Sequence, residues 1–297
     1  TPLWAYGNPE NPATFNNPGF TIEVTKDVET IITWRNELVD ADDNYLPHII
    51  QDQNGNPLVD QTLHWAAPNG LCADSEKTKD CRGNTADIYT GPVPMVVHVH
   101  GAHVNPTSDG YPEAWWLPDA NNIPAGYATT GTFYGTTAPA DPGTAVYSYE
   151  NDQPTATLWY HDHSLGMTRL NVYAAGAGFW MIRDANDGET GVISGVLPGP
   201  APLAGDTAAA LNTPGDPVRS AVREIPIAIQ PKSFNADGTQ YYPADRAFFE
   251  GLGTGGIFAD NTDVNIPFLP QSISDIAPVW NPEAFFNTMV VNGSTWP

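Results

Sequence analysis

Phe20-Thr-Ile-Glu-Val-Thr25 alternates apolar and polar side chains, which is the period-two pattern of a strand with one buried face. Glu29-Thr-Ile-Ile-Thr-Trp-Arg35 repeats this alternation with one slip. Turn-rich segments separate six further strand candidates: Met95–His100, Ala145–Tyr149, Ala156–His161, Gly178–Arg183, Ile225–Gln230 and Thr288–Asn292. Many short strands joined by Gly/Pro turns predict an all-β protein built as a sandwich or a barrel.

A change of composition divides the chain. Residues 184–217 are rich in Gly, Pro, Ala and Asp and carry little apolar periodicity, which is typical of a linker. We therefore predict a first β-domain over residues 1–184, a linker over residues 185–217 and a second β-unit over residues 218–297. The second unit holds few strand candidates, whereas a sandwich needs about seven strands. We expect it to be only part of a domain.

The charge balance argues against two classes of partner. The 297 residues carry 11 Lys and Arg against 34 Asp and Glu, a formal net charge of −23. A nucleic-acid binder needs a basic face to neutralise phosphates, and an anionic membrane surface attracts polybasic patches. No apolar run approaches the roughly 20 residues that span a bilayer. We therefore expect neither a nucleic acid nor a membrane as a partner.

Two features favour export from the cytoplasm. The sequence starts at Thr1 without Met or a leader, which predicts a processed mature form. Cys72 and Cys81 lie close together in a polar segment, which suits a local disulfide of about 2–3 kcal/mol. Two free thiols are the alternative. We predict a secreted or otherwise extracytoplasmic protein and favour the disulfide.

Five of the seven histidines fall in two clusters. His98-Val-His100-Gly-Ala-His103 begins at the end of one strand candidate, and His161-Asp-His163 lies at the end of another. Residues i and i+2 of a strand project from the same face about 7 Å apart, so each His-X-His pair can hold one metal or serve two. Imidazole nitrogens suit copper, zinc, iron and nickel rather than magnesium or calcium. One such pair is often accidental, but two predict a metal site at His98, His100, His161 and His163.

The other histidines are weaker ligand candidates. His103 lies at an odd offset from His100, so it turns to the opposite face if the strand continues. His48 and His64 stand alone in the sequence. We expect both of these to have structural roles.

Three charged residues flank the clusters. Asp162 lies between two candidate ligands and faces away from them, so it is placed to hold a water or a backbone group beside the site. Asp109 follows the first cluster in a turn. Either acid could relay protons, or Asp109 could form an Asx-turn and Asp162 a solvated surface acid. Arg169 could balance a buried acid or form an ordinary surface ion pair.

Four stretches of the sequence match one known family together. They are His98-Val-His100-Gly, Ser108-Asp-Gly-Tyr-Pro-Glu-Ala-Trp115, Leu158-Trp-Tyr-His-Asp-His163 and Thr168-Arg-Leu-Asn-Val-Tyr-Ala174. With these motifs the chain resembles the first domain of multicopper oxidases, most closely the branch of bacterial spore-coat laccases and bilirubin oxidases. The resemblance implies cupredoxin-like Greek-key β-sandwich domains, here one complete domain and part of a second. It also implies copper in two places, a mononuclear type 1 site and a trinuclear cluster bound by eight histidines.

The resemblance also implies a role for each candidate residue. His98 matches the ligand of the type 2 copper, and His100, His161 and His163 match ligands of the type 3 pair. Asp109 matches the acid that assists proton delivery, while no ligand of the family falls at His103. The implied reaction is laccase-like, coupling one-electron oxidation of a reducing substrate to four-electron reduction of O2 to water.

The sequence departs from the family in what it lacks. A type 1 copper needs two His and a Cys, but neither Cys72 nor Cys81 has a neighbouring His, and no His follows His163. The chain therefore supplies half of the cluster ligands, and we expect a C-terminal half or subunit to supply the rest and the type 1 copper. The expected partners are that chain, O2 and a small reducing substrate, which is a phenol, a pigment or a metal ion.

Two other classes of protein remain as alternatives. A binuclear zinc hydrolase is one, because His98-X-His100-X-X-His103 nearly gives the metallo-β-lactamase pattern, although Ala102 stands where that pattern has Asp. The alternating β/α architecture of such hydrolases is also missing from the predicted strands. A non-catalytic cupredoxin-like copper-binding module is the other. Its relatives typically lose cluster histidines, whereas all four first-domain positions are filled here.

Overall fold

A computed structural model describes residues 2–52, 54–61, 64–70, 79–82, 88–183, 226–242 and 286–295, with the backbone alone at 80–82. Within these ranges there is no helix with the length and apolar character that crossing a bilayer requires. The predicted linker over residues 185–217 lies outside the described residues, as does Cys72. The domain boundaries and the Cys72–Cys81 disulfide therefore stay predictions.

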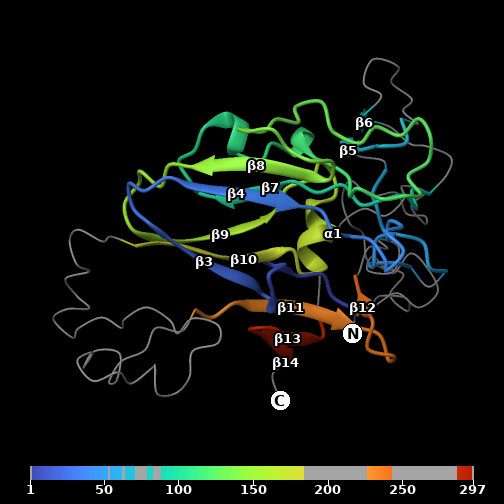
Figure 1. The fold of residues 1–297 in the computed structure, drawn as a ribbon. Coiled ribbons are helices and arrows are strands. Elements are labelled where there is room, and N and C mark those ends of the chain that lie inside the picture. Colours follow the sequence, from blue (N-terminus) through green and yellow to red (C-terminus); the bar gives the residue numbers. More distant parts are fainter. Residues whose placement is uncertain are drawn as a thin grey trace, which may run out of the picture.

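The largest sheet of the first unit brings together strands that are far apart in the sequence. Its four strands lie in the order β3 (Gly19–Thr25), β10 (Ala177–Arg183), β9 (Ala156–Asp162) and β7 (Val97–His100). β3 and β10 run parallel, and the other neighbours run antiparallel. Figure 1 shows β9, β10 and β3 below β4 and β8 in this view. The two strands that carry the histidine clusters, β7 and β9, are direct neighbours.

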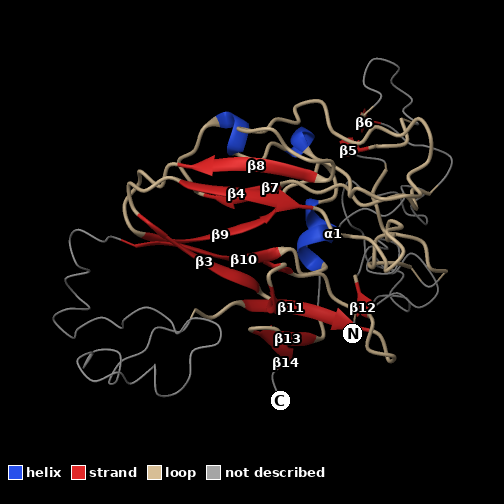
Figure 2. Cartoon of the chain, viewed as in Figure 1, coloured by secondary structure: helices blue, strands red, loops and turns tan. Residues whose placement is uncertain are grey.

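A second sheet covers the first. It pairs β4 (Thr30–Arg35) with β8 (Thr144–Tyr149) along six residues, and Figure 2 shows the layers of strands. The buried core contains aromatic side chains of both sheets, among them Trp34 on β4 and Trp180 on β10. Trp34 Nε1 donates to the hydroxyl of Tyr149 at 2.9 Å. Two packed layers with a shared core confirm the all-β, cupredoxin-like sandwich predicted from the sequence.

Short elements surround the sandwich. β1 (Tyr6–Asn8) and β2 (Asn11–Asn16) form a hairpin, and β5 (His64–Ala66) pairs with β6 (Asp80–Arg82). Two 3-10 turns, η1 (Pro106–Ser108) and η2 (Pro112–Ala114), follow β7. The α-helix α1 (Thr168–Tyr173) follows the second histidine cluster and leads into β10. The segments that flank the histidines are therefore η1–η2 on one side and α1 on the other.

The second unit packs against α1. Its strands lie in the order β12 (Gln240–Tyr241), β11 (Ile229–Phe234), β13 (Thr288–Val291) and β14 (Ser294–Thr295). Lys232 is 2% exposed; its Nζ donates to the carbonyl of Tyr173 and, at 3.0 Å, to Gln240 Oε1. The hydroxyl of Tyr173 donates to the carbonyl of Tyr241 at 2.7 Å. These bonds join the C-terminal end of α1 to the second sheet.

Most strand ends agree with the sequence-based expectation. Seven of the eight predicted strands are found within two residues of their predicted ends. The exception is the expected strand Ile225–Gln230, which was wrong because the observed strand, β11, begins at Ile229 and continues to Phe234. The prediction relied on the alternating apolar residues Ile227 and Ile229, but both of these side chains are exposed. Pairing with β13 and burial further along the strand set its position instead.

Candidate metal centre

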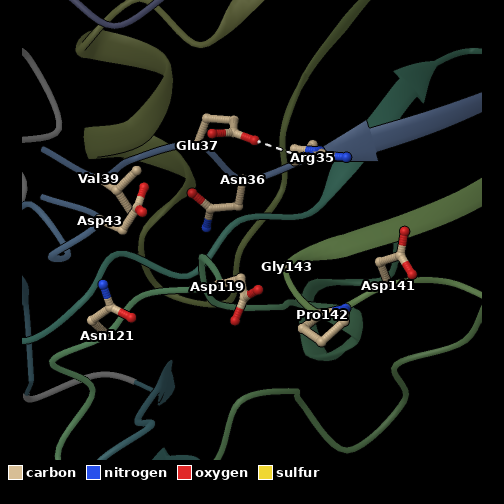
Figure 3. A pocket seen from close by; sticks show the side chains of 10 residues that line it. All are labelled: Arg35, Asn36, Glu37, Val39, Asp43, Asp119, Asn121, Asp141, Pro142 and Gly143. Carbon is tan, nitrogen blue, oxygen red and sulfur yellow. Dashed lines mark hydrogen bonds and ion pairs between the residues drawn. The ribbon is translucent and has the colours of Figure 1, made fainter. Parts of the chain in front are cut away.

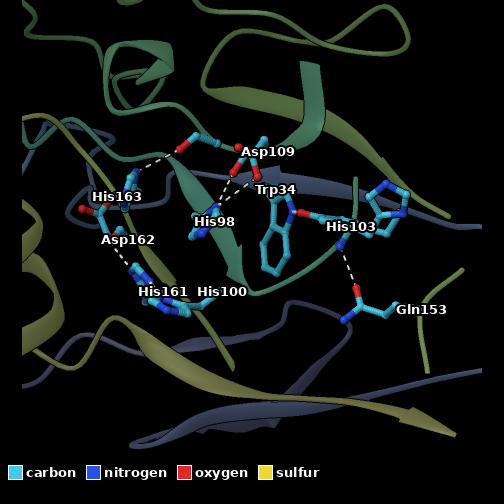
Figure 4. Close-up of polar contacts among 11 residues, drawn as sticks. Trp34, His98, His100, His103, Asp109, Gln153, His161, Asp162 and His163 are labelled. Atoms are coloured by element: carbon cyan, nitrogen blue, oxygen red, sulfur yellow. Dashed lines mark hydrogen bonds and ion pairs between the residues drawn. The ribbon is translucent and has the colours of Figure 1, made fainter. Parts of the chain in front are cut away.

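The histidine clusters meet across the ladder between β7 and β9. His98 lies directly opposite His161, and His100 lies directly opposite Trp159. Because side chains of i and i+2 share one face of a strand, His98 and His100 point to the same side. One ring nitrogen from each of His98, His100 and His161 lies within 4.8 Å of the others. Figure 4 shows these three rings close together.

His163 joins this group from the loop that follows β9. Its backbone N–H donates to the carbonyl of Val96 at 2.9 Å, which anchors the loop to the start of β7. Its ring centroid lies 4.9 Å from that of His98 and 5.6 Å from that of His161. The structure thus brings together the four histidines that the sequence predicted as metal ligands.

Backbone carbonyls orient three of the four rings. The Nδ1 of His98 lies 2.5 Å from the carbonyl oxygen of Asp109, that of His161 lies 2.7 Å from its neighbour Asp162, and that of His163 lies 3.1 Å from Gly110. A carbonyl oxygen only accepts, so each Nδ1 carries the proton and donates it. The Nε2 of these three rings is then left with a free lone pair, the form in which imidazole binds a metal.

Gly110 makes the loop that supplies two of these carbonyls possible. Its backbone φ is +76°, and a Cβ at this position would lie 2.2 Å from the carbonyl oxygen of Val97. Only glycine has both the conformational freedom and the lack of a side chain that this close approach needs. The chain can therefore pass over β7 and present the carbonyls of Asp109 and Gly110 to the rings.

His100 is oriented differently. Its Nδ1 lies 3.2 Å from the Nε2 of His161. The Nδ1 of His161 holds a proton toward Asp162, so its Nε2 is an acceptor that faces His100. Two nitrogens bound to one tetrahedral ion lie roughly 3.3 Å apart when each metal–nitrogen bond is about 2.0–2.1 Å. The observed separation fits two ligands of one metal ion.

An aromatic side chain borders the same pair of rings. Trp159 is stacked on His100 with ring centroids 5.1 Å apart and planes at 25°, and its centroid lies 4.2 Å from that of His161. Trp159 was not among the predicted site residues. The signal was present, because Trp159 precedes His161 by two positions and therefore shares its face of β9.

Burial keeps two of the imidazoles neutral. It lowers the pKa of His161 to about 4, against the opposing effect of the carbonyl of Asp162. Burial, together with the proximity of His98, also lowers the pKa of His163. Metal ligation requires the neutral ring. The site is therefore ready to bind a cation at neutral pH without first losing protons from these two rings.

Asp162 faces away from the rings, as the sequence predicted. It is 2% exposed, and its carboxylate accepts from the N–H of Val96 at 3.1 Å, from both the N–H and the hydroxyl of Ser164 at 2.9 Å, and from Nδ2 of Asn171 at 2.9 Å. Burial raises its pKa to about 6, although the hydrogen bonds oppose this. The expectation of a bound backbone group is confirmed, and the alternative of a solvated acid is wrong because the carboxylate lies in the protein interior.

Asp109 lies at the end of η1. Its carbonyl binds His98, and its carboxylate oxygen Oδ1 lies 3.4 Å from the same ring nitrogen. The carboxylate is 35% exposed, so it lies between the rings and solvent. This is the position that a group exchanging protons between the two needs.

The remaining candidates lie elsewhere. His103 is 77% exposed and its Nδ1 lies 2.7 Å from Asp152, so it is not in the cluster. His48 is buried, and its ring accepts from the N–H of Ile50 and donates to Asn171. His64 lies in β5, outside the cluster. The structural role expected for His48 is confirmed, and the hydrolase pattern lacks its third ligand.

Arg169 contributes to packing rather than to charge balance. Its guanidinium lies 4.8 Å from the centre of the Tyr242 ring, and its Nη2 donates to the carbonyl of Leu58 at 3.4 Å. Both expectations for this residue, an ion pair with a buried acid and an ion pair at the surface, differ from these contacts. An aromatic face and a carbonyl take the place of the carboxylate.

A separate cavity of about 490 Å³ lies where β4 ends and β8 is about to begin (Figure 3). Its lining is polar and includes the carboxylates of Glu37, Asp43, Asp119 and Asp141. Arg35 forms an ion pair with Glu37, with its Nη1 3.2 Å from Oε1. None of the four clustered histidines lines this cavity. The candidate chemistry is therefore on the face of β7 and β9 and not in the cavity.

Comparison with known proteins shows what this chain is similar to. A family model described as multicopper oxidase matches residues 119–187, which include His161 and His163. Multicopper oxidase LPR1 of Arabidopsis thaliana is 29% identical over 297 residues, which are all of this chain and 34% of the relative. A laccase of Bacillus subtilis (strain 168) is 28% identical over all of this chain and 38% of its own length. Over its whole length the chain is therefore similar to proteins named multicopper oxidase or laccase.

The comparisons also set the extent of the match. The chain spans about a third of the length of these multicopper oxidases. A solved laccase structure from Pediococcus acidilactici is 17% identical, with a TM-score of 0.42 over 93% of this chain and 31% of the laccase. The similarity to multicopper oxidases favours copper as the metal, and a group of four imidazoles is a donor set that suits copper.

Proposed function

We propose that this chain is the N-terminal part or subunit of a laccase-like multicopper oxidase. The enzyme would couple one-electron oxidation of a reducing substrate to reduction of O2 by four electrons and four protons, giving two molecules of water. The observation that carries this proposal is the convergence of His98, His100, His161 and His163 on one face of β7 and β9. Their similarity in sequence to the ligands of multicopper oxidases supports the same reading.

The proposed ligand assignment follows the matched motifs. His98 would bind the type 2 copper, and His100, His161 and His163 would bind the type 3 pair. The 3.2 Å separation of His100 Nδ1 and His161 Nε2 supports a shared ion for these two rings. When bound, copper supplies one-electron chemistry, since it cycles between Cu(I) and Cu(II).

The residues of the chain would support this chemistry in two ways. The carbonyls of Asp109, Asp162 and Gly110 hold three rings in one tautomer and orientation, which limits rearrangement of the ligands. The carboxylate of Asp109 would take up protons from solvent and pass them toward the site where O2 is reduced. Its partial exposure and its contact with His98 support that role.

The rest of the oxidase would complete the site. The 297 residues would provide four of the eight histidines of the cluster, and neither Cys72 nor Cys81 has a neighbouring His with which to build a type 1 copper site. A C-terminal half or subunit would supply both, and a small reducing substrate, a phenol, a pigment or a metal ion, would donate electrons to the type 1 copper. We further propose that the protein is exported and that Cys72 and Cys81 form a disulfide.

Reconstitution tests the proposal. The chain is mixed with the C-terminal part of the same oxidase in the presence of copper, and blue absorption and O2 consumption are measured. We expect neither signal from the chain alone and both from the mixture. A chain that is folded, monodisperse and active as an oxidase on its own would contradict the proposal.

A further inference from the structure

The four rings of the copper site are not held in the same way. The Nδ1 of His98, His161 and His163 each donates to a backbone carbonyl, which fixes both the tautomer and the ring plane. The Nδ1 of His100 faces His161 instead of a carbonyl. His100 is also the exposed member of the group, whereas His161 is buried. Its orientation therefore needs another cause.

Trp159 is in a position to orient the His100 ring. Residue pairing across β7 and β9 sets Trp159 directly opposite His100, and the two rings are stacked at 5.1 Å with planes at 25°. The same indole lies 4.2 Å from the ring of His161, at 34°. The rigid indole ring of Trp159 thus contacts both imidazoles, those of His100 and His161, whose nitrogens face each other at 3.2 Å.

The contacts of Trp159 distinguish it from a core residue. Its side chain is 39% exposed, whereas the next residue, Tyr160, points to the opposite face and is 1% exposed within the core. A large apolar ring on the outer face of a sheet gains little from core packing. Its stacking on the two imidazoles is the interaction that its place on the strand creates.

We propose that Trp159 is a positioning residue for copper binding, which holds the His100 ring so that its Nδ1 and the Nε2 of His161 face the same ion. This inference rests on the proposed function. The stack takes the place of the carbonyl that each of the other three rings has. Groups that orient a metal-binding histidine typically change metal affinity by about 10- to 100-fold when they are removed.

A comparison of variants in the full chain tests this role. Cu²⁺ affinity is measured by competition with a chelator for the wild type, Trp159→Ala, Trp159→Phe and the control Phe133→Ala. Phe133 is another exposed aromatic residue, 63% accessible, outside the site. We expect about 10-fold weaker binding for Trp159→Ala, recovery to within about 3-fold for Trp159→Phe, and no change for Phe133→Ala. Wild-type affinity in Trp159→Ala would overturn the inference.

A double-mutant cycle separates orientation of His100 from general stability. In a His100→Ala background, Trp159→Ala should change the copper affinity by less than about 2-fold, because the ring that it orients is gone. An equal loss in both backgrounds would overturn the inference. If Trp159→Ala does not fold, the cycle is run with Trp159→Leu, and ring-to-ring NMR contacts between Trp159 and His100 are measured in the metal-free wild type. Absence of those contacts would also overturn it.

The copper affinity of the wild type distinguishes a failure of this inference from a failure of the proposed function. If the wild-type chain binds no copper through its histidines, the proposed function itself fails. If the wild type binds copper and the Trp159 variants bind it equally well, only the positioning role fails.

Discussion

Asn171 on α1 donates from Nδ2 to Oδ1 of Asp162 at 2.9 Å, and both side chains are buried in the protein interior. The same amide donates to the carbonyl of Pro94, and its Oδ1 accepts from His48. Helix α1, the segment before β7 and the end of β9 are therefore joined at one side chain. Asp162 lies between His161 and His163 in the sequence, so we expect the geometry of the candidate copper site to depend on this junction.

Replacement of Asn171 by alanine should destabilise the protein. Asn171→Ala leaves the carbonyl of Pro94, the carboxylate of Asp162 and the His48 N–H each short of a partner, and an unsatisfied buried group costs about 1–3 kcal/mol. We expect a loss of about 3 kcal/mol in the free energy of unfolding in urea, together with weaker copper binding. Asn121→Ala, which removes an exposed bond to the carbonyl of Asp42, is the matched control and should change stability little. Equal stability of the two variants would contradict the role of the junction.

Replacement of Gly110 by alanine should disturb both stability and metal binding. A Cβ at Gly110 meets the carbonyl oxygen of Val97 at 2.2 Å, and the backbone is left-handed with φ +76°. Gly126 is the control, because its φ is +91° and nothing lies within 4 Å of its would-be Cβ. For Gly126→Ala we expect the free energy of unfolding to fall by about 1 kcal/mol, from backbone strain alone. For Gly110→Ala we expect it to fall by about 3 kcal/mol or more.

The copper affinity of the same two variants separates the site from the fold. Gly110→Ala should weaken copper binding by on the order of 10-fold, since the carbonyls that orient His98 and His163 move with the loop. Gly126→Ala should bind copper as the wild type does. Calorimetric copper titrations of both variants check this, and a weaker site in Gly126→Ala would count against it.

The four histidines of this site could be predicted from the sequence because they follow strand periodicity. Alternation places His98 with His100, and His161 with Trp159, on common faces without any knowledge of the fold. The hydrogen-bond partners around these rings could not be predicted from the sequence. The carbonyl of Gly110 and its partner His163 are 53 residues apart in the chain, and the N–H of Val96 and its partner Asp162 are 66 residues apart. Such contacts depend on loop paths, which side-chain patterns do not encode. The start of β11 was missed for a related reason, since pairing with the distant β13 sets it.

The stability of the protein should fall on acidification because of His48. Burial lowers the pKa of His48 to about 3, whereas the unfolded chain has a histidine pKa of about 6.5. The unfolded state takes up this proton first, so stability is full above pH 6.5 and is lost progressively as the pH falls toward 3. Between pH 7.5 and 5 the expected loss from this one group is about 2 kcal/mol.

The variant His48→Gln isolates this contribution. It keeps a donor for Asn171 but does not titrate, so it should be less stable than the wild type at pH 7.5 and should lose about 2 kcal/mol less on going to pH 5. Urea unfolding of the metal-free proteins at both pH values measures the difference. His161 titrates in both proteins and cancels. An identical pH dependence would show that His48 does not titrate on unfolding.

Asp109→Asn should slow O2 reduction without emptying the copper site. The backbone carbonyl that holds His98 is retained, so copper affinity should stay within about 3-fold of the wild type. Loss of a group that transfers protons costs on the order of 100-fold in rate. O2 consumption by the assembled oxidase measures this, with Asp152→Asn, beside the remote His103, as the control. Weakened copper binding with an unchanged rate per bound copper would reassign Asp109 to a purely structural role.

Copper titration of the chain, read by electron paramagnetic resonance, tests the convergence of the four imidazoles most directly. We predict a Cu²⁺ spectrum with coupling to several imidazole nitrogens, unchanged in His103→Ala, weakened in each of His98→Ala, His100→Ala, His161→Ala and His163→Ala, and lost when all four are replaced. Wild-type copper affinity and nitrogen coupling in the fourfold variant would contradict the account.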